Sequence, residues 1–173
     1  MTYLKTLAAA LFVVPSAASA ATLTEIAAAD GRFTTLLAAV DVAGLRETLD
    51  GEGPFTLYAP IDEAFSDLPP DLVSTLLKPE NKEQLTDILL YHVDDRKLKA
   101  GTIPIGSNFF KPVLDTERMC ITKTDDGLTI DDGTGETATV VVADIKADNG
   151  VIHVIDKVLL PGTRPSCGEM SSF

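Results

Sequence analysis

The first half of the chain has a helical pattern of apolar residues. Between Ala21 and Asp50, apolar side chains recur at spacings of three and four, and the pattern is interrupted near Gly31 and again at 41–44. This period is typical of helices with one buried face, so the segment predicts two or three short helices. A further helix is expected to start at Pro70, because proline suits the first turn of a helix.

A last helix is predicted over 79–93. Within it His92 follows Ile88 and Leu89 at spacings of four and three, so the histidine lies on the apolar face. We therefore expect His92 to point into the core of the protein.

The second half alternates between apolar and polar residues, as strands do. A strand is expected at 55–59, a hairpin over 119–131 around the turn Asp126-Gly127, and a last pair of strands at 137–145 and 151–160. The final run is apolar on both faces, which predicts a central, buried strand. Helices that precede strands, without regular alternation of the two, indicate an α+β domain.

The first twenty residues have the pattern of a secretory signal peptide. Lys5 provides a positive charge, 7–14 is an apolar run, and Ala18-Ser19-Ala20 offers a cleavage site between small residues. The apolar run is well short of the ~20 residues that span a bilayer. We therefore predict a signal peptide over 1–20 and a mature chain that starts at Ala21 and has no membrane span.

Acidic side chains outnumber basic ones. The chain has 26 Asp and Glu against 14 Lys and Arg, which gives a formal net charge of −12. Such a chain repels nucleic acid and anionic lipid headgroups, so we expect neither as a partner. The basic stretch "RKLK" at 96–99 follows two aspartates and is interpreted as a solvated loop.

Cys120 and Cys167 are the only cysteines. An even pair in an exported chain favours a disulfide, which would tie the C-terminal tail, 163–173, to the strand around Cys120. A thiol nucleophile is the alternative, but neither cysteine lies in a reactive motif such as CxxC.

Three segments together resemble the motifs of a known family. They are "FTLYAPIDEAF" (55–65), "LLYHV" (89–93) and "NGVIHVIDKVLLP" (149–161). In order and spacing they are similar to the two boundary motifs and the central Tyr-His motif of the fasciclin domain, and the resemblance covers essentially the whole mature chain. One departure is Ile61, where the family more often has Thr or Asn. The next residue, Asp62, is expected to cap a short helix.

This resemblance implies a compact fasciclin-like domain over 21–162, with a mostly antiparallel β-wedge flanked by several short helices. It also implies a role in adhesion or extracellular interaction, with protein or glycan partners, rather than catalysis. Tyr91 belongs to the Tyr-His motif, which the resemblance associates with adhesion in some animal relatives, although its neighbour His92 is expected to be buried.

His92 and His153 are the only histidines, and both stand among aliphatic residues. They could belong to a metal site, a catalytic site or the core. Zinc needs three or four ligands at short spacing, and the sequence has no calcium-loop motif, so we expect no metal or other cofactor. For catalysis, the sequence has neither a G-x-S-x-G nucleophile motif nor an isolated pair of carboxylates. We therefore interpret both histidines as core residues whose ring nitrogens are hydrogen-bonded.

Specific contacts are expected at the motif positions. His92 should reach the capping region around Asp62, and His153 should bond a neighbouring backbone or hydroxyl group. Asn149-Gly150 is expected to form a tight turn with positive φ. Asp156 is expected to end at the sheet edge or to cap a local backbone group.

These observations favour an exported, non-enzymatic adhesion or interaction module, secreted or periplasmic and of bacterial source. Its partner would be an extracellular or cell-surface protein or glycan, or a second copy of the chain, met at an exposed edge strand or a shallow apolar patch on a helix. The alternatives are an extracytoplasmic small-molecule or glycan-binding protein and a hydrolase. A roomy polar pocket that exposes both histidines would favour the alternatives, whereas a closed core around both would favour the interaction module.

Overall fold

The computed structural model describes residues 21–165 and Cys167. The predicted signal peptide and the tail beyond Cys167 lie outside these residues. The helices and 3-10 turns (η) are α1 (Leu23–Asp30), α2 (Thr34–Ala43), α3 (Arg46–Leu49), α4 (Asp62–Ser66), α5 (Pro70–Leu76), η1 (Pro79–Asn81), α6 (Lys82–Tyr91) and η2 (Ala100–Thr102). The strands are β1 (Phe55–Pro60), β2 (Val93–Asp94), β3 (Gly106–Phe110), β4 (Met119–Thr124), β5 (Gly127–Asp131), β6 (Thr137–Ala147) and β7 (Gly150–Ile155). No helix in this part of the chain is long and apolar enough to cross a bilayer.

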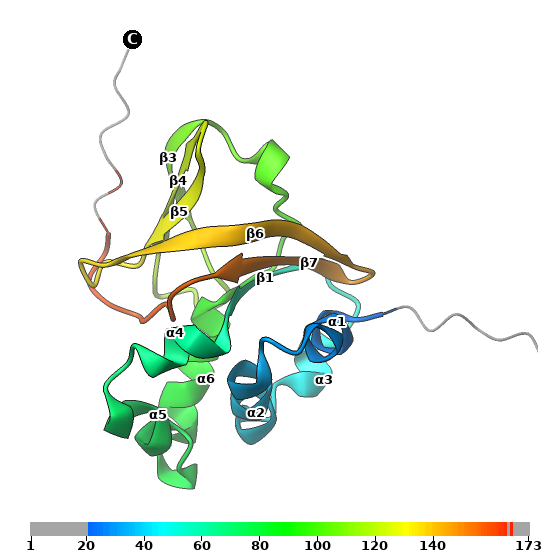
Figure 1. Ribbon diagram of the computed structural model, residues 1–173, viewed down its shortest axis with the longest axis vertical. Helices are drawn as coiled ribbons and strands as arrows, with labels where there is room; N and C mark the ends of the chain where they lie inside the picture. The colour runs from blue at the N-terminus through cyan, green and yellow to red at the C-terminus, as the bar shows by residue number, and fades with distance from the viewer. Residues whose placement is uncertain (1–20, 166, 168–173) are drawn as a thin grey trace, which may run out of the picture.

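The seven strands form one curled sheet in the order β2-β1-β7-β6-β5-β4-β3. Every neighbouring pair is antiparallel except β1 and β7, which run parallel. β6 has 11 residues and joins the two ends of the sheet, because its start pairs with β5 and the rest pairs with β7. Irregularities in its register between Val140 and Ile145 bend the strand, and β3, β4 and β5 turn away from the helices (Figure 1).

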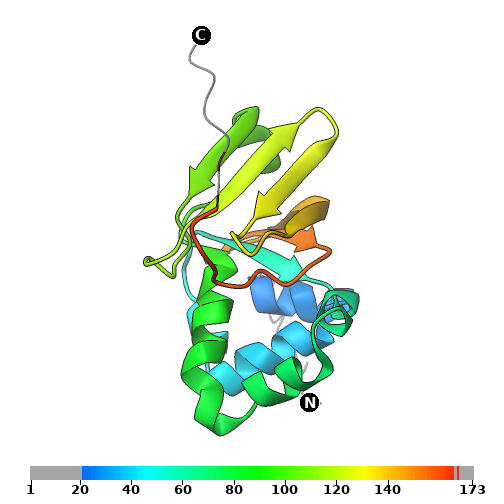
Figure 2. The same cartoon turned by 90° about the vertical axis from the view of Figure 1, so that its left-hand side faces the viewer.

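β1 and β7 separate two apolar cores. Figure 2 shows the helices on one side of these strands and β3, β4 and β5 on the other. Toward the helices, Leu57 and Ile152 belong to a core built with residues of α1, α2 and α6. Toward the other strands, Tyr58 and Ile155 belong to a second core with Met119 of β4. All six residues of β7 are buried, which confirms the prediction of a central strand.

β7 ends at Ile155 rather than at Leu160, where the sequence pattern ends. The N–H of Asp156 donates to Thr139 O at 3.2 Å, and the Asp156 carboxylate accepts the N–H of Thr139 at 2.6 Å. Asp156 thus caps a local backbone group, which is one of its two expected roles. Beyond it the chain leaves the sheet and passes beside the end of α6.

The outer part of the sheet contains two further predicted features. The hairpin predicted over 119–131 is the β4–β5 pair, in which Thr124 lies opposite Gly127 across the turn. Gly127 has a φ of 148°, a conformation that favours glycine. A disulfide joins Cys120 in β4 to Cys167, with the two Cα atoms 5.4 Å apart. It attaches the segment after β7 to the outer strands.

Replacing both cysteines by alanine is expected to lower the free energy of unfolding by up to about 4 kcal/mol, because the disulfide closes a loop that spans 47 positions of the unfolded chain. Urea denaturation of the two proteins measures the change. A reductant should bring the wild-type chain toward the stability of the double variant and leave the variant unchanged. Equal stabilities of the oxidised wild type and the variant would contradict this expectation.

Candidate functional site

His92 directly follows α6 and is buried, with 1 % of its surface exposed. Its Nδ1 contacts Ile88 O at 2.7 Å, one turn back in the helix, and its Nε2 accepts the N–H of Leu159 at 3.0 Å. An Nε2 that accepts a hydrogen bond carries no proton, so the neutral ring donates from Nδ1 to the carbonyl. The ring fastens the end of α6 to the segment after β7.

Asp62 makes neither of the contacts that the sequence predicts for it. The predicted link to His92 is wrong, because both nitrogens of that ring bond backbone groups. The predicted cap of its own helix is also wrong, because α4 has no side-chain cap. Instead the Asp62 carboxylate accepts the Thr34 hydroxyl at 2.6 Å and the N–H groups of Thr34 and Thr35 at 3.2 and 2.8 Å. Asp62 therefore caps α2, because the first N–H groups of a helix have no partner within the helix itself.

His153 lies in β7 with none of its surface exposed. Its Nε2 donates to Leu98 O at 2.7 Å, and its Nδ1 accepts the N–H of Asp144 at 3.3 Å. These backbone partners are of the kind that the sequence predicts. The imidazole also stacks on Tyr58, with ring centroids 5.7 Å apart. His153 thus ties β7 to β6 and to the loop that precedes η2.

Burial lowers the pKa of both histidines, because an imidazolium ion is poorly solvated inside a core. The pKa of His92 falls to about 4, and that of His153 is also lowered. Asp132 lies close enough to His92 to oppose this shift, but the effect of burial is larger. Both rings are therefore neutral at pH 7. Neither presents a free nitrogen lone pair to a substrate or a metal ion.

Tyr91 is fully buried, so its side chain cannot contact a partner directly. Its hydroxyl donates to Arg118 O at 2.9 Å. Burial raises the pKa of this hydroxyl above the usual range of tyrosine, and the hydroxyl keeps its proton. The Tyr-His motif therefore lies inside the protein, and any influence on binding must pass through the fold.

Asn149 connects three segments at the turn between β6 and β7. Its Oδ1 accepts the N–H of Leu23 in α1 at 3.0 Å. Its Nδ2 donates to Leu49 O, at the last residue of α3, at 2.7 Å and to Gly51 O, just after that helix, at 2.9 Å. The side chain therefore holds the ends of two helices against the sheet.

Gly150 is required by close packing and not by its φ angle. The predicted positive φ is wrong, since neither Asn149 nor Gly150 has one. Gly150 opens β7 directly opposite Phe55 of β1. A Cβ at position 150 would lie 2.2 Å from Phe55 O, far inside van der Waals contact. The strands can approach this closely only where one of them has no side chain.

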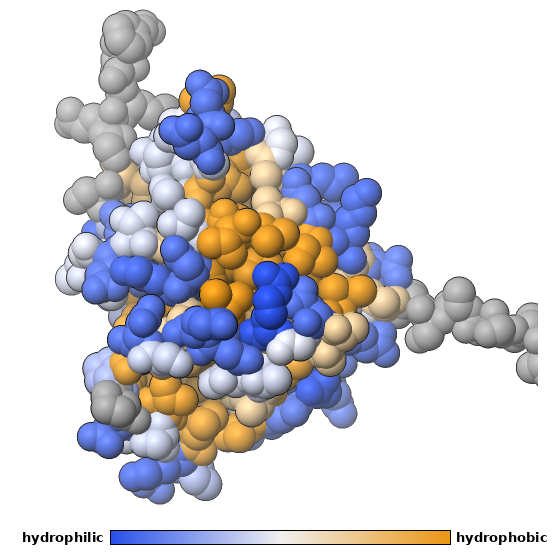
Figure 3. Space-filling view, in the orientation of Figure 1, coloured by the Kyte–Doolittle hydropathy of each residue, from blue (hydrophilic) through white to orange (hydrophobic). Residues whose placement is uncertain are grey.

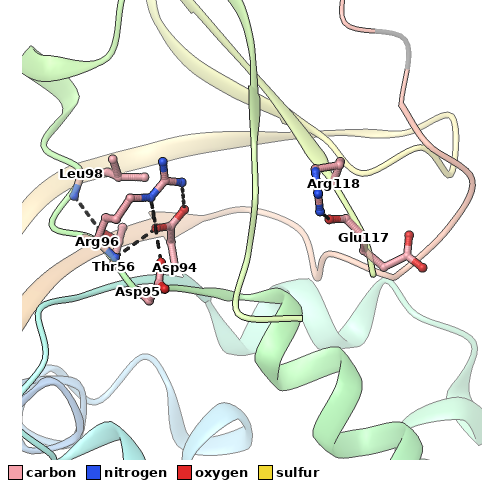
Figure 4. Close-up of polar contacts among 7 residues, drawn as sticks. All are labelled: Thr56, Asp94, Asp95, Arg96, Leu98, Glu117 and Arg118. Carbon is pink, nitrogen blue, oxygen red and sulfur yellow. Dashed lines mark hydrogen bonds and ion pairs between the residues drawn. The ribbon is translucent and has the colours of Figure 1, made fainter. Parts of the chain in front are cut away.

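An ion pair between a buried aspartate and a half-exposed arginine lies beside β1 and is not predicted by the sequence. Asp94 in β2 is 1 % exposed, and Arg96 contacts its carboxylate through Nε at 2.8 Å and Nη2 at 2.6 Å (Figure 4). The Thr56 hydroxyl donates to Arg96 O and accepts the N–H of Leu98 at 2.8 Å. The basic stretch 96–99 is a loop in which Arg96, Lys97 and Lys99 are exposed, as the sequence predicts, and the Thr56 hydroxyl fastens its backbone to β1. The only sequence signal of the ion pair is an aspartate two positions before an arginine.

Two small hollows adjoin His92. One, of about 30 Å³, lies among α2, α4, α5 and α6, and the other, of about 40 Å³, lies among α2, α3, α6 and β1. Both are lined almost entirely by apolar side chains, and each has room on the order of a few water molecules. Within residues 21–165 and Cys167, no group of three or more His, Cys, Asp or Glu side chains could hold a metal ion.

Gly150→Ala is expected to lower the free energy of unfolding by about 2 kcal/mol or more, because the added methyl group would overlap Phe55 O and push β1 and β7 apart. Gly101→Ala is the matched control, since a Cβ at position 101 would meet nothing within 4 Å. Urea denaturation measures both changes. A Gly150→Ala chain as stable as the control would show that the close approach is not required.

Stability is expected to fall as the pH drops from about 6.5 toward 4. An unfolded histidine binds a proton near pH ~6.5, whereas folded His92 binds one only near pH 4, so protons stabilise the unfolded chain in this window. His92→Gln cannot make this contribution, so its stability should depend less on pH over the same range. Urea denaturation at several pH values compares the two proteins. Parallel slopes would count against a neutral, buried His92.

Residues 31–161 match the family model of the Fasciclin domain. The chain is 44 % identical over 143 residues to Protein sll1483 of Synechocystis sp., and the match covers 83 % of this chain and 75 % of that protein. It is 37 % identical over 140 residues to the transforming growth factor-beta-induced protein ig-h3 of Sus scrofa, covering 81 % of this chain and 19 % of that protein. The chain also resembles a solved FAS1 domain pair from the insect cell adhesion molecule Fasciclin I. The match covers 81 % of this chain and 51 % of the solved chain, with a TM-score of 0.70 and 18 % identity, so the two share a fold. The chain belongs to the Fasciclin domain family and has its α+β fold.

Proposed function

We propose that this chain is an exported, non-enzymatic interaction module that binds extracellular or cell-surface proteins or glycans. The observation that carries the proposal is the closed core around His92 and His153. Both rings are buried, and every ring nitrogen bonds a backbone group. The side chains best suited to acid–base or metal chemistry therefore hold segments of the fold together. Binding is left to the outer surface.

The alternative functions have no comparable support. A small-molecule-binding protein or a hydrolase would need a pocket with room for its ligand and a few polar groups directed into it. The hollows at His92 are small and apolar. Three larger surface depressions have more room, but neither histidine lines any of them.

Several features support an exported adhesive module. One relative of the same fold is described as a cell adhesion molecule. The predicted signal peptide over 1–20 and the disulfide favour an oxidising compartment, secreted or periplasmic. A relative in Synechocystis supports a bacterial source. In this proposal a single domain occupies 21–162, and the disulfide ties the tail 163–173 to it.

Exposed apolar side chains indicate where a partner would bind. Figure 3 shows apolar residues gathered over the middle of β6, where Val141 and Val142 are 51 % and 38 % exposed. Ile105, just before the edge strand β3, is 75 % exposed, and Phe109, within that strand, is 46 % exposed. Val42 of α2 is exposed by 40 % but is the one large apolar side chain exposed on a helix in the described chain, so it makes no patch by itself.

The immobilised chain, incubated with envelope and matrix extracts with and without calcium, is expected to retain particular proteins or glycans. Mass spectrometry and glycan staining identify them. Tyr91→Phe should retain the same set, because this side chain is buried and cannot contact a partner. An unrelated protein of similar net charge on the same matrix controls for electrostatic capture. Retention of nothing beyond that control would contradict the proposal.

A further inference from the structure

β3 is the last strand of the sheet, and its free edge carries no charge. Among residues 21–165 and Cys167, the strand pairs with β4 alone. The stretch 102–110, TIPIGSNFF, has no charged residue in a chain whose net charge is −12. Natural proteins usually protect a free edge with charges, bulges or an inserted proline, because unpaired backbone groups bind other strands. Here the one proline, Pro104, precedes the strand and does not interrupt it.

Ser107 and Phe109 share the face of β3 that points away from the core, and Ile105, just before the strand, is 75 % exposed. Residues of a strand alternate between its two faces, and Phe110, on the opposite face, is buried in the second core. The Ser107 hydroxyl bonds the Thr122 hydroxyl of β4 at 2.8 Å, so the Ser107 side chain is held against the neighbouring strand. The edge therefore presents two large apolar side chains on either side of a small polar one.

The two ends of β3 lie beside opposite charges. At the C-terminal end are two exposed cations: Lys111, which pairs with Asp115 at 3.6 Å, and Arg164, whose guanidinium lies 4.7 Å from the centre of the Phe109 ring. At the N-terminal end lies the exposed turn Asp125-Asp126, because β4 ends beside the start of β3. Lys123, opposite Gly106 at this same end, donates to backbone carbonyls at and after η2. Each copy of β3 thus has a basic end and an acidic end.

The backbone of this edge can pair with another strand. The side-chain amide of Asn108 donates to Pro104 O and Gly106 O, each at 3.1 Å. These carbonyls are therefore directed to a side chain and not to β4. In an antiparallel pair, the Gly106 carbonyl would instead accept the N–H of the partner's Asn108. In the single chain, the Asn108 side chain thus occupies carbonyl groups that a second strand would bind instead.

We propose that two copies of the chain pair through β3 in antiparallel orientation, around a two-fold axis at Ser107. In this register Ile105 of each copy lies opposite the partner's Phe109, so the exposed apolar side chains cover one another. The basic end of each strand then lies beside the Asp125-Asp126 turn of the other copy, whereas parallel pairing would bring like charges together. The inference rests on the proposed interaction function and gives it a surface and a partner.

Pairing through β3 is expected to have a low affinity, because the paired strands are short. The strand has five residues, whereas a stable interface buries about 800 Å² on each partner. A dissociation constant on the order of 100 µM is expected for such a contact. Many copies displayed on two facing surfaces would still hold together, because each contact raises the effective concentration for the next.

Sedimentation velocity of the purified chain, from about 10 µM to about 1 mM, tests the pairing. A reversible dimer is expected at the upper end of this range. Ile105→Lys and Phe109→Lys should each weaken it at least about tenfold, because they place a cation in the covered apolar pair. Val42→Lys, at a side chain of α2 with 40 % exposure, is the matched control and should not weaken it. A monomer at every concentration, or a dimer unaffected by both β3 variants, overturns the inference.

Ser107→Cys tests the position of the axis. The two copies of residue 107 would form a non-hydrogen-bonded pair with Cα atoms about 4.5 Å apart, within the range of a disulfide. Mild oxidation should link two chains through position 107, as peptide mapping would show. Thr137→Cys, at an exposed position of β6, should not form such a link. Linking at neither position, or equally at both, overturns the two-fold pairing.

The same variants separate this inference from the proposed function. The wild type and Ile105→Lys are compared in the retention experiment with envelope extracts. A chain that stays monomeric but retains protein or glycan partners would overturn the β3 pairing alone. A chain that dimerises through β3 but retains nothing else would contradict only the binding of other molecules.

Discussion

The parallel pairing of β1 with β7 is the contact on which the rest of the structure depends. It joins the first long strand to the last one, from Phe55 opposite Gly150 to Pro60 opposite Ile155. The backbones approach so closely at its start that only glycine fits at position 150. Side chains alternate across the pair, so one face supports the helices and the other supports β3, β4 and β5. Both apolar cores therefore require this pair to form.

Buried polar groups fasten the surrounding segments to these two strands. His153 holds the loop before η2, His92 holds the segment after β7, and Asn149 holds the ends of two helices. Each bonds backbone groups, because a buried polar group without a partner costs about 1–3 kcal/mol. Among the described residues, the Tyr58 hydroxyl is the buried side-chain group that has no such partner. The polar interior thus fixes the arrangement of the elements.

In the proposed function the outer surface binds the partner, and that surface is not uniform. The net charge of −12 keeps copies of the chain apart over most approaches. The uncharged edge at β3 is a place where close approach has little electrostatic cost, and its exposed Ile105 and Phe109 gain from being covered. General repulsion therefore favours association at uncharged surface such as this edge. Such a surface suits reversible contacts that become strong only in number.

The sequence by itself determined the features that depend on neighbouring residues: the helical first half, the β4–β5 hairpin, the buried last strand, the disulfide and the family. Their signals are periodicity, turn residues and short motifs, which are local. Only the tertiary structure decided that His92 bonds Leu159, that Asp62 caps α2, and that the Thr56 hydroxyl of β1 accepts the N–H of Leu98. It also replaced a turn by close strand packing as the reason for Gly150. A hydrogen bond or a close contact between distant segments depends on where the fold brings them together, and no local pattern specifies that position.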